Sequence, residues 1–280
     1  MHVHVGDVKL FFDVEGAKLV PDGPVMRERP TLLLLHGGPG FDHSSFKPMF
    51  APLAEVAQLV YLDHRGNGRS DLSTPDRWNL AQWGDDVRAF CDALGIEQPI
   101  VLGHSFGGFV AMSYATRHPE HPAKLILSST AGRHRFDRVV AAFARLGGPD
   151  AGNAARRYWE QPGVETARDY ARLCLPLYTR TPQDPDAAAR TLWRFDVMFD
   201  FGAGEDLRFN LLPELHKVRC PTLVLGGDRD PITPIEDAGD IAAALPRELV
   251  RFERFADCGH GVFHDDPERA FRVLREFILG

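Results

Sequence analysis

Short runs of consecutive apolar residues, each ending in a glycine-rich or polar turn, most limit the folds open to this chain. They are Thr31–Leu35, Leu59–Leu62, Ile100–Leu102, Leu125–Leu127, Thr222–Leu225 and Leu249–Phe255. Strands of a parallel sheet are covered on both faces and therefore read as unbroken apolar runs. Stretches with helical spacing lie between them, at about 80–94, 106–117 and 267–279. This alternation predicts an α/β fold, with a mostly parallel sheet and helices on both of its faces.

Two segments depart from that alternation. Residues 2–17 alternate apolar and polar side chains, which predicts one or two antiparallel strands. Between Thr130 and Cys220 no strand-like run occurs, and residues 131–215 hold twelve Arg, no Lys and twelve acids, with eleven of the 28 aromatic residues. We expect 131–215 to be a helical cap insertion over the strand ends, with 1–130 and 216–280 forming one catalytic core. Ordinary core helices are the alternative interpretation.

Charge and cysteine usage limit the partners and the compartment. Among the 280 residues, 32 Lys and Arg stand against 39 Asp and Glu, a net charge of −7 that argues against nucleic acid or an anionic membrane as main partner. The four cysteines are widely spaced, which fits reduced thiols better than a disulfide framework. No signal peptide is visible at the N-terminus, and no apolar run approaches the ~20 residues of a membrane-spanning helix. We therefore expect a cytoplasmic location.

A serine flanked by glycines follows the run Ile100–Leu102, in Gly103-His-Ser-Phe-Gly107, and matches the pattern G-x-S-x-G. Apolar residues at helical spacing come directly after it, so the serine stands between a strand and a helix. Such a turn is sharp and crowds its neighbours, so the positions two before and two after it need glycine. The turn lifts the Ser105 hydroxyl clear of the backbone at a helix N-terminus, which favours negative charge.

A serine hydroxyl is a weak nucleophile and needs a base that a third group orients. Asp230 follows the run Thr222–Leu225, and His260 lies in a loop after the run Leu249–Phe255. The order Ser105, Asp230, His260 is the order along the chain in which a triad with this kind of elbow occurs. The sequence thus predicts a catalytic triad, with Asp228 and His264 as the alternative acid and base.

Five motifs along the chain share one family pattern. They are His36-Gly-Gly-Pro-Gly40, Asp63-His-Arg-Gly-Asn-Gly-Arg-Ser70, Gly103-His-Ser-Phe-Gly-Gly108, Gly227-Asp-Arg-Asp-Pro231 and Cys258-Gly-His260. With them the chain resembles the α/β-hydrolase family over nearly its whole length, and the first motif looks most like the proline iminopeptidase branch. The resemblance implies Ser105 as nucleophile, His260 as base and Asp230 as acid, with the backbone N–H groups of Gly38 and Phe106 as the oxyanion hole. Amides preset at that position typically contribute ~10²–10³ each in rate.

The resemblance also ranks the alternatives. Asp230 precedes Pro-Ile-Thr-Pro as the family's acid does, which favours it over Asp228. His260 follows Cys-Gly, the family context, and His264 is then a rim or surface residue.

Other polar residues near these motifs have structural interpretations. Hydrogen bonding to nearby backbone is the ordinary role for His36 and His104, which flank the site. The segment Asp63–Ser70 is interpreted as a structural turn in which Asp63 and Arg65 pair with each other.

The predicted triad implies acyl transfer through a covalent intermediate. Ser105 attacks a carbonyl carbon while His260 takes its proton, and Asp230 holds the imidazole in the required tautomer. We expect activity to fall in acid as His260 becomes protonated. The sequence has no His, Cys, Asp or Glu cluster with metal-ligand spacing and no phosphate-binding glycine loop before a Lys, so we expect no cofactor and no metal.

The substrate is the least determined part of the prediction. An aminopeptidase must hold a free ammonium group, which calls for a carboxylate; Glu160, Glu205 and Glu214 are the candidates, with Glu205 first. His104 and Trp159 are the further candidates for substrate contact. The chain has Pro231 where some relatives carry a glutamate and Phe106 where larger proline iminopeptidases carry a Trp.

These departures keep several functions open. The prediction is a proline iminopeptidase-like hydrolase that acts on a small molecule or short peptide. The alternatives are a carboxylesterase or a lactonase, for example of acyl homoserine lactones, and a small-ligand receptor with weak hydrolysis. The aromatic-rich insertion suits a small apolar or cyclic acyl group in each case.

Overall fold

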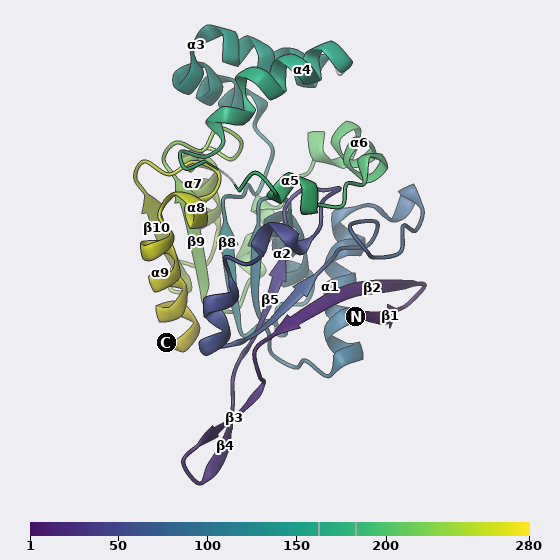
Figure 1. The fold of residues 1–280 in the computed structure, drawn as a ribbon, viewed down its shortest axis with the longest axis vertical. Coiled ribbons are helices and arrows are strands. Elements are labelled where there is room, and N and C mark those ends of the chain that lie inside the picture. The colour runs from purple at the N-terminus through teal and green to yellow at the C-terminus, as the bar shows by residue number, and fades with distance from the viewer. Residues whose placement is uncertain (162, 183) are drawn as a thin grey trace.

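The computed structural model describes residues 1–161, 163–182 and 184–280. Within them an eight-stranded sheet has the strand order β1-β2-β6-β5-β7-β8-β9-β10 (Figure 1). Its strands are β1 (His2–Val5), β2 (Val8–Glu15), β5 (Thr31–Leu35), β6 (Gln58–Leu62), β7 (Ile100–His104), β8 (Lys124–Ser128), β9 (Thr222–Gly227) and β10 (Val250–Phe255). β1 pairs antiparallel with β2, and β2 with β6, while the neighbours from β6 to β10 are all parallel. The predicted α/β fold is confirmed.

Helices cover both faces of this sheet. The described α-helices are α1 (Leu80–Leu94), α2 (Phe106–Arg117), α3 (Phe136–Glu160), α4 (Val164–Leu173), α5 (Ala187–Arg190), α6 (Phe195–Ala203), α7 (Ile235–Ala244), α8 (Val262–Asp265) and α9 (Pro267–Leu279). Short 3-10 helices are at His43–Phe46, Ala51–Glu55, Pro75–Arg77, Leu175–Leu177, Glu205–Leu207 and Leu212–Lys217. α3 contains a kink at Gly148, which has φ 83° and precedes Pro149.

The strand side chains alternate between two cores. Leu33 and Leu35 of β5 join the core with α1, α2 and α7, whereas Leu32 and Leu34 join the core with α9. All four leucines are fully buried. Burial on both faces explains why this strand is an unbroken apolar run in the sequence.

Most of the predicted elements are found where the sequence placed them. The helix predicted at about 80–94 is α1, which Asn79 begins by accepting the N–H of Gln82 at 2.9 Å and Gly95 ends at φ 66°. The antiparallel strands predicted within 2–17 are β1 and β2.

Several elements were absent from the prediction. The hairpin of β3 (Leu19–Asp22) and β4 (Val25–Glu28) extends from the end of the molecule opposite α3 and α4 (Figure 1). Its side chains Leu19, Val25 and Met26 are exposed, so no buried face imposes an alternating pattern on its sequence. Helices α7 and α8 were also not predicted.

Between β8 and β9 the described residues form helices and no strand of the sheet. α3 and α4 lie together at one end of the molecule (Figure 1), and they share a small core of their own that includes Phe143 and Tyr170. Where this interval begins and ends, Arg133 and Asn210 form an isolated bridge, and Leu211 N–H donates to the Gly132 carbonyl at 2.7 Å. The division of the chain at 130/131 and 215/216 remains a prediction, and the second boundary falls within the 3-10 helix Leu212–Lys217.

All four cysteines are buried and unpaired among the described residues, in agreement with the predicted free thiols. None of the described helices combines the length and the hydropathy that crossing a bilayer would require.

The predicted pairing of Asp63 with Arg65 is wrong. Arg65 instead makes a two-pronged ion pair with Asp86 of α1, through Nε to Oδ2 at 2.7 Å and Nη2 to Oδ1 at 2.8 Å. Asp63 accepts Nδ1–H of His43 at 2.6 Å and the backbone N–H of Arg69 at 2.9 Å. Side-chain partners in this turn are set by the helix that packs on it, which local sequence does not encode. Gly66 and Gly68 have φ of 78° and 52°, consistent with a structural turn.

Replacing Arg65 with Met is expected to destabilise the protein strongly. Arg65 is 1% exposed and Asp86 4% exposed, so the variant leaves a buried carboxylate without its counter-charge. Such a loss costs about 3–5 kcal/mol in the free energy of unfolding. Arg88→Met is the control, because Arg88 pairs with Asp92 on the exposed side of the same helix, where a pair contributes about 0.5 kcal/mol. Urea denaturation measures both; equal losses would contradict the prediction.

Candidate active site

The turn between β7 and α2 holds Ser105 in a strained conformation, with φ 55° and ψ −122°. A Cβ on Gly103 would lie 2.6 Å from the carbonyl carbon of Gly107, and one on Gly107 would lie 2.6 Å from that of Leu35. Real Cβ atoms do not approach backbone so closely, so both positions require glycine, as the sequence predicted. A non-glycine residue at positive φ is uncommon and marks a turn whose geometry the surroundings impose.

The predicted base reaches the predicted nucleophile. His260 lies in the loop between β10 and α8, and its Nε2 is 3.0 Å from Ser105 Oγ. Its Nδ1 is 2.8 Å from Asp230 Oδ2, and the His260 side chain is only 12% exposed. With Nδ1–H donating to the carboxylate, Nε2 is left to accept the serine hydroxyl proton.

The carboxylate of Asp230 is fully buried just after β9. Its Oδ1 accepts the backbone N–H groups of Ile232 and Thr233 at 2.8 and 2.9 Å, and its Oδ2 accepts the Thr233 hydroxyl at 2.8 Å. These donors fix the carboxylate facing His260 and compensate for its burial. The alternative acid, Asp228, pairs instead with Arg254 at 3.1 Å. Sequence reasoning missed Thr233, although the Thr of Pro-Ile-Thr-Pro was available as a signal.

The loop of the predicted oxyanion hole passes beside the nucleophile. A Cβ on Gly37 would lie 3.4 Å from Ser105 Cβ, and Gly38 has φ 131°. His36 Nδ1–H donates to the Gly37 carbonyl at 2.7 Å, and His36 Nε2 accepts the backbone N–H of His64 at 3.3 Å. His36 therefore has the backbone-bonded role expected for it, and it holds the peptide that precedes Gly38.

The amides of Gly38 and Phe106 are free to take a ligand. Within the described part of the chain, neither N–H has a protein acceptor. Phe106 opens α2, where the first amides have no partner inside the helix. The oxyanion role of the two groups remains a prediction.

The ring of His104 lies next to that of His260. Its ring centroid is 5.3 Å from that of His260 and 6.2 Å from that of Phe263. Burial, together with the nearby His260, lowers the pKa of His104 to about 3, so its ring is neutral at physiological pH. Its Nδ1 has no hydrogen-bond partner among the described residues. Contact of His104 with a substrate remains a prediction.

Glu205, the predicted ammonium anchor, is engaged elsewhere. Its Oε2 accepts the backbone N–H of Leu80 at 2.8 Å, at the first residue of α1. Burial raises the pKa of Glu205, and the bond from Leu80 lowers it in part. It lines a surface hollow whose other residues come from α1, from α2 and the residue after it, and from the segment 211–217, and none of them belongs to the predicted triad. The structure therefore gives no support for an ammonium group at Glu205.

The other residues suggested from the sequence also have local partners. Trp159 packs edge to face on Phe136 and on Tyr170, with centroids 5.4 Å apart in each case. Glu160 faces Arg156 at 3.7 Å, and Glu214 forms an ion pair with Lys217.

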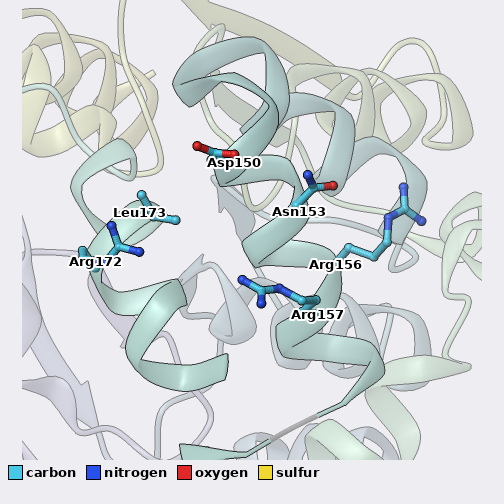
Figure 2. Close-up of a pocket in the computed structure, with 6 residues that line it drawn as sticks. All are labelled: Asp150, Asn153, Arg156, Arg157, Arg172 and Leu173. Carbon is cyan, nitrogen blue, oxygen red and sulfur yellow. The ribbon is translucent and has the colours of Figure 1, made fainter. Parts of the chain in front are cut away.

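A second hollow lies between α3 and α4 (Figure 2). Its lining residues are Asp150, Asn153, Arg156, Arg157, Arg172 and Leu173. Two of the arginines, Arg157 and Arg172, form ion pairs with the carboxylate of Asp169 at 2.8 and 3.2 Å. None of the predicted triad residues lines this hollow, so it is separate from the candidate site.

Comparison with known proteins agrees with the observed fold. Residues 30–267 match the family model described as the alpha/beta hydrolase fold. The chain is 29% identical to proline iminopeptidase PfmaB of Pestalotiopsis fici, an alignment that covers 96% of this chain and 98% of that protein.

Solved structures share the fold. The proline iminopeptidase of Mycobacterium smegmatis aligns with a TM-score of 0.77 and 23% identity, over 99% of this chain and 97% of that chain. The enol-lactonase of Burkholderia xenovorans LB400 aligns with a TM-score of 0.74 and 20% identity, over the full length of both chains. The resemblance seen in the five motifs is confirmed, and the chain belongs to the α/β-hydrolase family.

Proposed function

We propose that the protein is a serine hydrolase that cleaves a small amide or ester through an acyl-enzyme, with a proline iminopeptidase-like activity. The observation that supports this most directly is the hydrogen-bonded series from Ser105 through His260 to the buried Asp230. A nucleophile, a base within reach of it and a group that orients the base are what such catalysis requires. The full-length similarity to proline iminopeptidase PfmaB supports the finer assignment.

The proposed reaction has two halves. Ser105 Oγ bonds to the substrate carbonyl carbon as its proton passes to His260 Nε2, and the Gly38 and Phe106 amides stabilise the oxyanion. His260 then gives that proton to the departing amine or alcohol, which leaves an acyl group on Ser105. A water molecule attacks the acyl carbon and gives its proton to His260, which returns it to Ser105 as the acid departs. Asp230 stabilises the imidazolium in both halves.

A second candidate function is a carboxylesterase or lactonase with the same triad. One observation favours it: the carboxylate chosen as ammonium anchor, Glu205, is occupied by the N-terminus of α1. Esters and lactones carry no ammonium group and need no such anchor.

A panel of three substrates tests the proposal. A prolyl arylamide, a short-chain aryl ester and an acyl homoserine lactone are compared by kcat/KM, with Ser105→Ala as the blank. Turnover of the arylamide supports the iminopeptidase-like activity, whereas an inert arylamide with a fast ester or lactone favours the second candidate. A folded protein that turns over none of them, and whose Ser105 does not react with a fluorophosphonate, would contradict both and leave the receptor alternative.

Glu205→Ala is expected to act on stability and not on substrate choice. Loss of the acceptor for Leu80 N–H at the start of α1 costs about 0.5–2 kcal/mol, as for the loss of an N-cap. Glu205→Gln is the control, since its amide oxygen still accepts that N–H. We expect kcat/KM for the arylamide and the ester to change by the same factor in both variants. A selective loss on the arylamide in Glu205→Gln would restore the ammonium role.

A further inference from the structure

The carboxylate of Asp265 is hydrogen-bonded both to the loop that holds His260 and to the segment 180–181, which lies between β8 and β9 in the chain. Asp265 is the last residue of α8, five residues after His260. Its Oδ2 accepts the backbone N–H of Gly259 at 2.7 Å, next to His260. Its Oδ1 accepts the N–H groups of Arg180 and Thr181 at 2.9 and 2.8 Å, which lie 85 and 84 residues earlier in the chain. A single side chain thus holds two distant segments against each other.

The two segments also touch directly. The backbone N–H of His260 donates to the Tyr178 carbonyl at 2.6 Å. A Cβ on Gly259 would lie 3.0 Å from the carbonyl carbon of Tyr178 and would overlap its oxygen, so the close approach requires glycine. The Tyr178 and His260 rings meet edge to face with centroids 5.8 Å apart.

The contact continues into the helices above it. Tyr178 and Tyr170 of α4 are joined through their hydroxyl groups at 2.6 Å. Tyr170 in turn belongs to the core that α3 and α4 share. The position of these helices is therefore linked by direct contacts to the position of the His260 backbone.

We propose that Asp265 is a positioning residue, which holds the His260 loop on the segment 178–181 so that Nε2 faces Ser105 Oγ. The inference rests on the proposed function, because the alignment matters only if His260 acts on Ser105. Its bonds are charge-assisted, from backbone amides to a carboxylate, and such bonds are shorter and stronger than neutral ones. A displacement of about 1 Å in a catalytic group can cost ~10²-fold in rate.

Asp265→Asn is the main test. The amide keeps the shape of the carboxylate but has one acceptor oxygen, so one of the two segments meets an NH₂ group in place of an acceptor. We expect the rate of fluorophosphonate labelling of Ser105, per folded molecule, to fall about 10- to 100-fold, with a similar fall in kcat. The low-field proton resonance of His260 Nδ1–H is expected to broaden or disappear.

Asp257→Asn is the matched control. Asp257 lies in the same loop and carries the same charge, but its carboxylate is exposed and pairs only with Arg180 and Arg229 at 3.3 and 3.9 Å among the described residues. Asn tolerates the φ of 61° at this position. We expect the labelling rate and kcat to stay within about twofold of the original protein and the His260 Nδ1–H resonance to remain. That result would show that the loss in Asp265→Asn does not come from removing a charge as such.

Two further measurements keep the outcomes separate. If Asp265→Asn does not fold, Gly259→Ala tests the same contact, because its Cβ pushes Tyr178 away while Asp265 stays; slow labelling is expected.

Amide hydrogen exchange at Gly259, Arg180 and Thr181 should speed up in Asp265→Asn whether or not Ser105 is reactive. An unreactive Ser105 in the original protein contradicts the proposed function alone. A folded Asp265→Asn protein with unchanged labelling and kcat overturns the positioning role.

Discussion

Ser105→Ala is expected to lower kcat by at least about 10⁴-fold on every substrate that the protein turns over. Without Oγ no acyl-enzyme can form, and the remaining hydrogen bond between His260 and Asp230 has no nucleophile to activate. Residues that act as a unit lose activity together, so adding His260→Ala to this variant should cost little more. Steady-state kinetics and fluorophosphonate labelling followed by mass spectrometry measure both effects.

A nearby serine provides the control for that experiment. Ser128 is fully buried, and its hydroxyl has no partner among the described residues, so Ser128→Ala removes a group that makes no hydrogen bond. We expect it to keep both turnover and labelling. A Ser105→Ala protein that still reacts with the fluorophosphonate would show that another residue is the nucleophile.

Gly107→Ala is expected to destabilise the protein by more than about 4 kcal/mol, in the range reserved for exceptional substitutions. Its Cβ would lie 2.6 Å from the carbonyl carbon of Leu35 and 2.7 Å from the carbonyl oxygen of His36. Both atoms belong to the backbone at the end of β5, in the centre of the sheet, and cannot move aside without breaking its pairing. The measurement is the free energy of unfolding in urea, or the soluble yield if the variant does not fold.

Gly239→Ala is the control for Gly107→Ala, because it makes the same substitution at a position where a Cβ has room. Gly239 lies within α7, and a Cβ there would meet nothing within 4 Å. Alanine is the better helix former by about 0.8–1.0 kcal/mol, so this variant should gain stability. Equal destabilisation by the two substitutions would contradict the steric explanation of the elbow.

The features that could be predicted from the sequence are those set by local geometry or by burial on both faces. β5 was predicted to the residue because all five of its side chains are buried. The elbow was predicted because its glycines and serine are within five residues of one another. Asp230 and His260 were predicted as acid and base from their order along the chain and the motifs around them. The structure places His260 within hydrogen-bond distance of both Asp230 and Ser105.

The features that could not be predicted depend on which distant segments meet. Arg65 and Asp86 are 21 residues apart, and nothing in the turn distinguishes Asp86 from the nearer Asp63 as partner. Nothing in the sequence near Glu205 indicates a partner for its carboxylate. In the structure it accepts the backbone N–H of Leu80, the first residue of α1, which lies 125 residues earlier in the chain. The contact of Tyr178 with His260 could not be predicted, because its hydrogen bond uses a backbone carbonyl, which any residue carries, and its ring is one of eleven aromatic side chains in 131–215.

The bridge between Arg133 and Asn210 places the start and the end of the helical segment between β8 and β9 side by side. A segment that leaves and returns at one point can change in length without moving the strands on either side. Each doubling of such a loop adds only about 0.6 kcal/mol of closure entropy. If the proposed function holds, substrate preference can therefore diverge by exchange of this segment as a module while Ser105, Asp230 and His260 are retained. The contact from Tyr178 to His260 sets the condition for a successful graft: a replacement must also provide a carbonyl at that point, or the histidine loop loses its support.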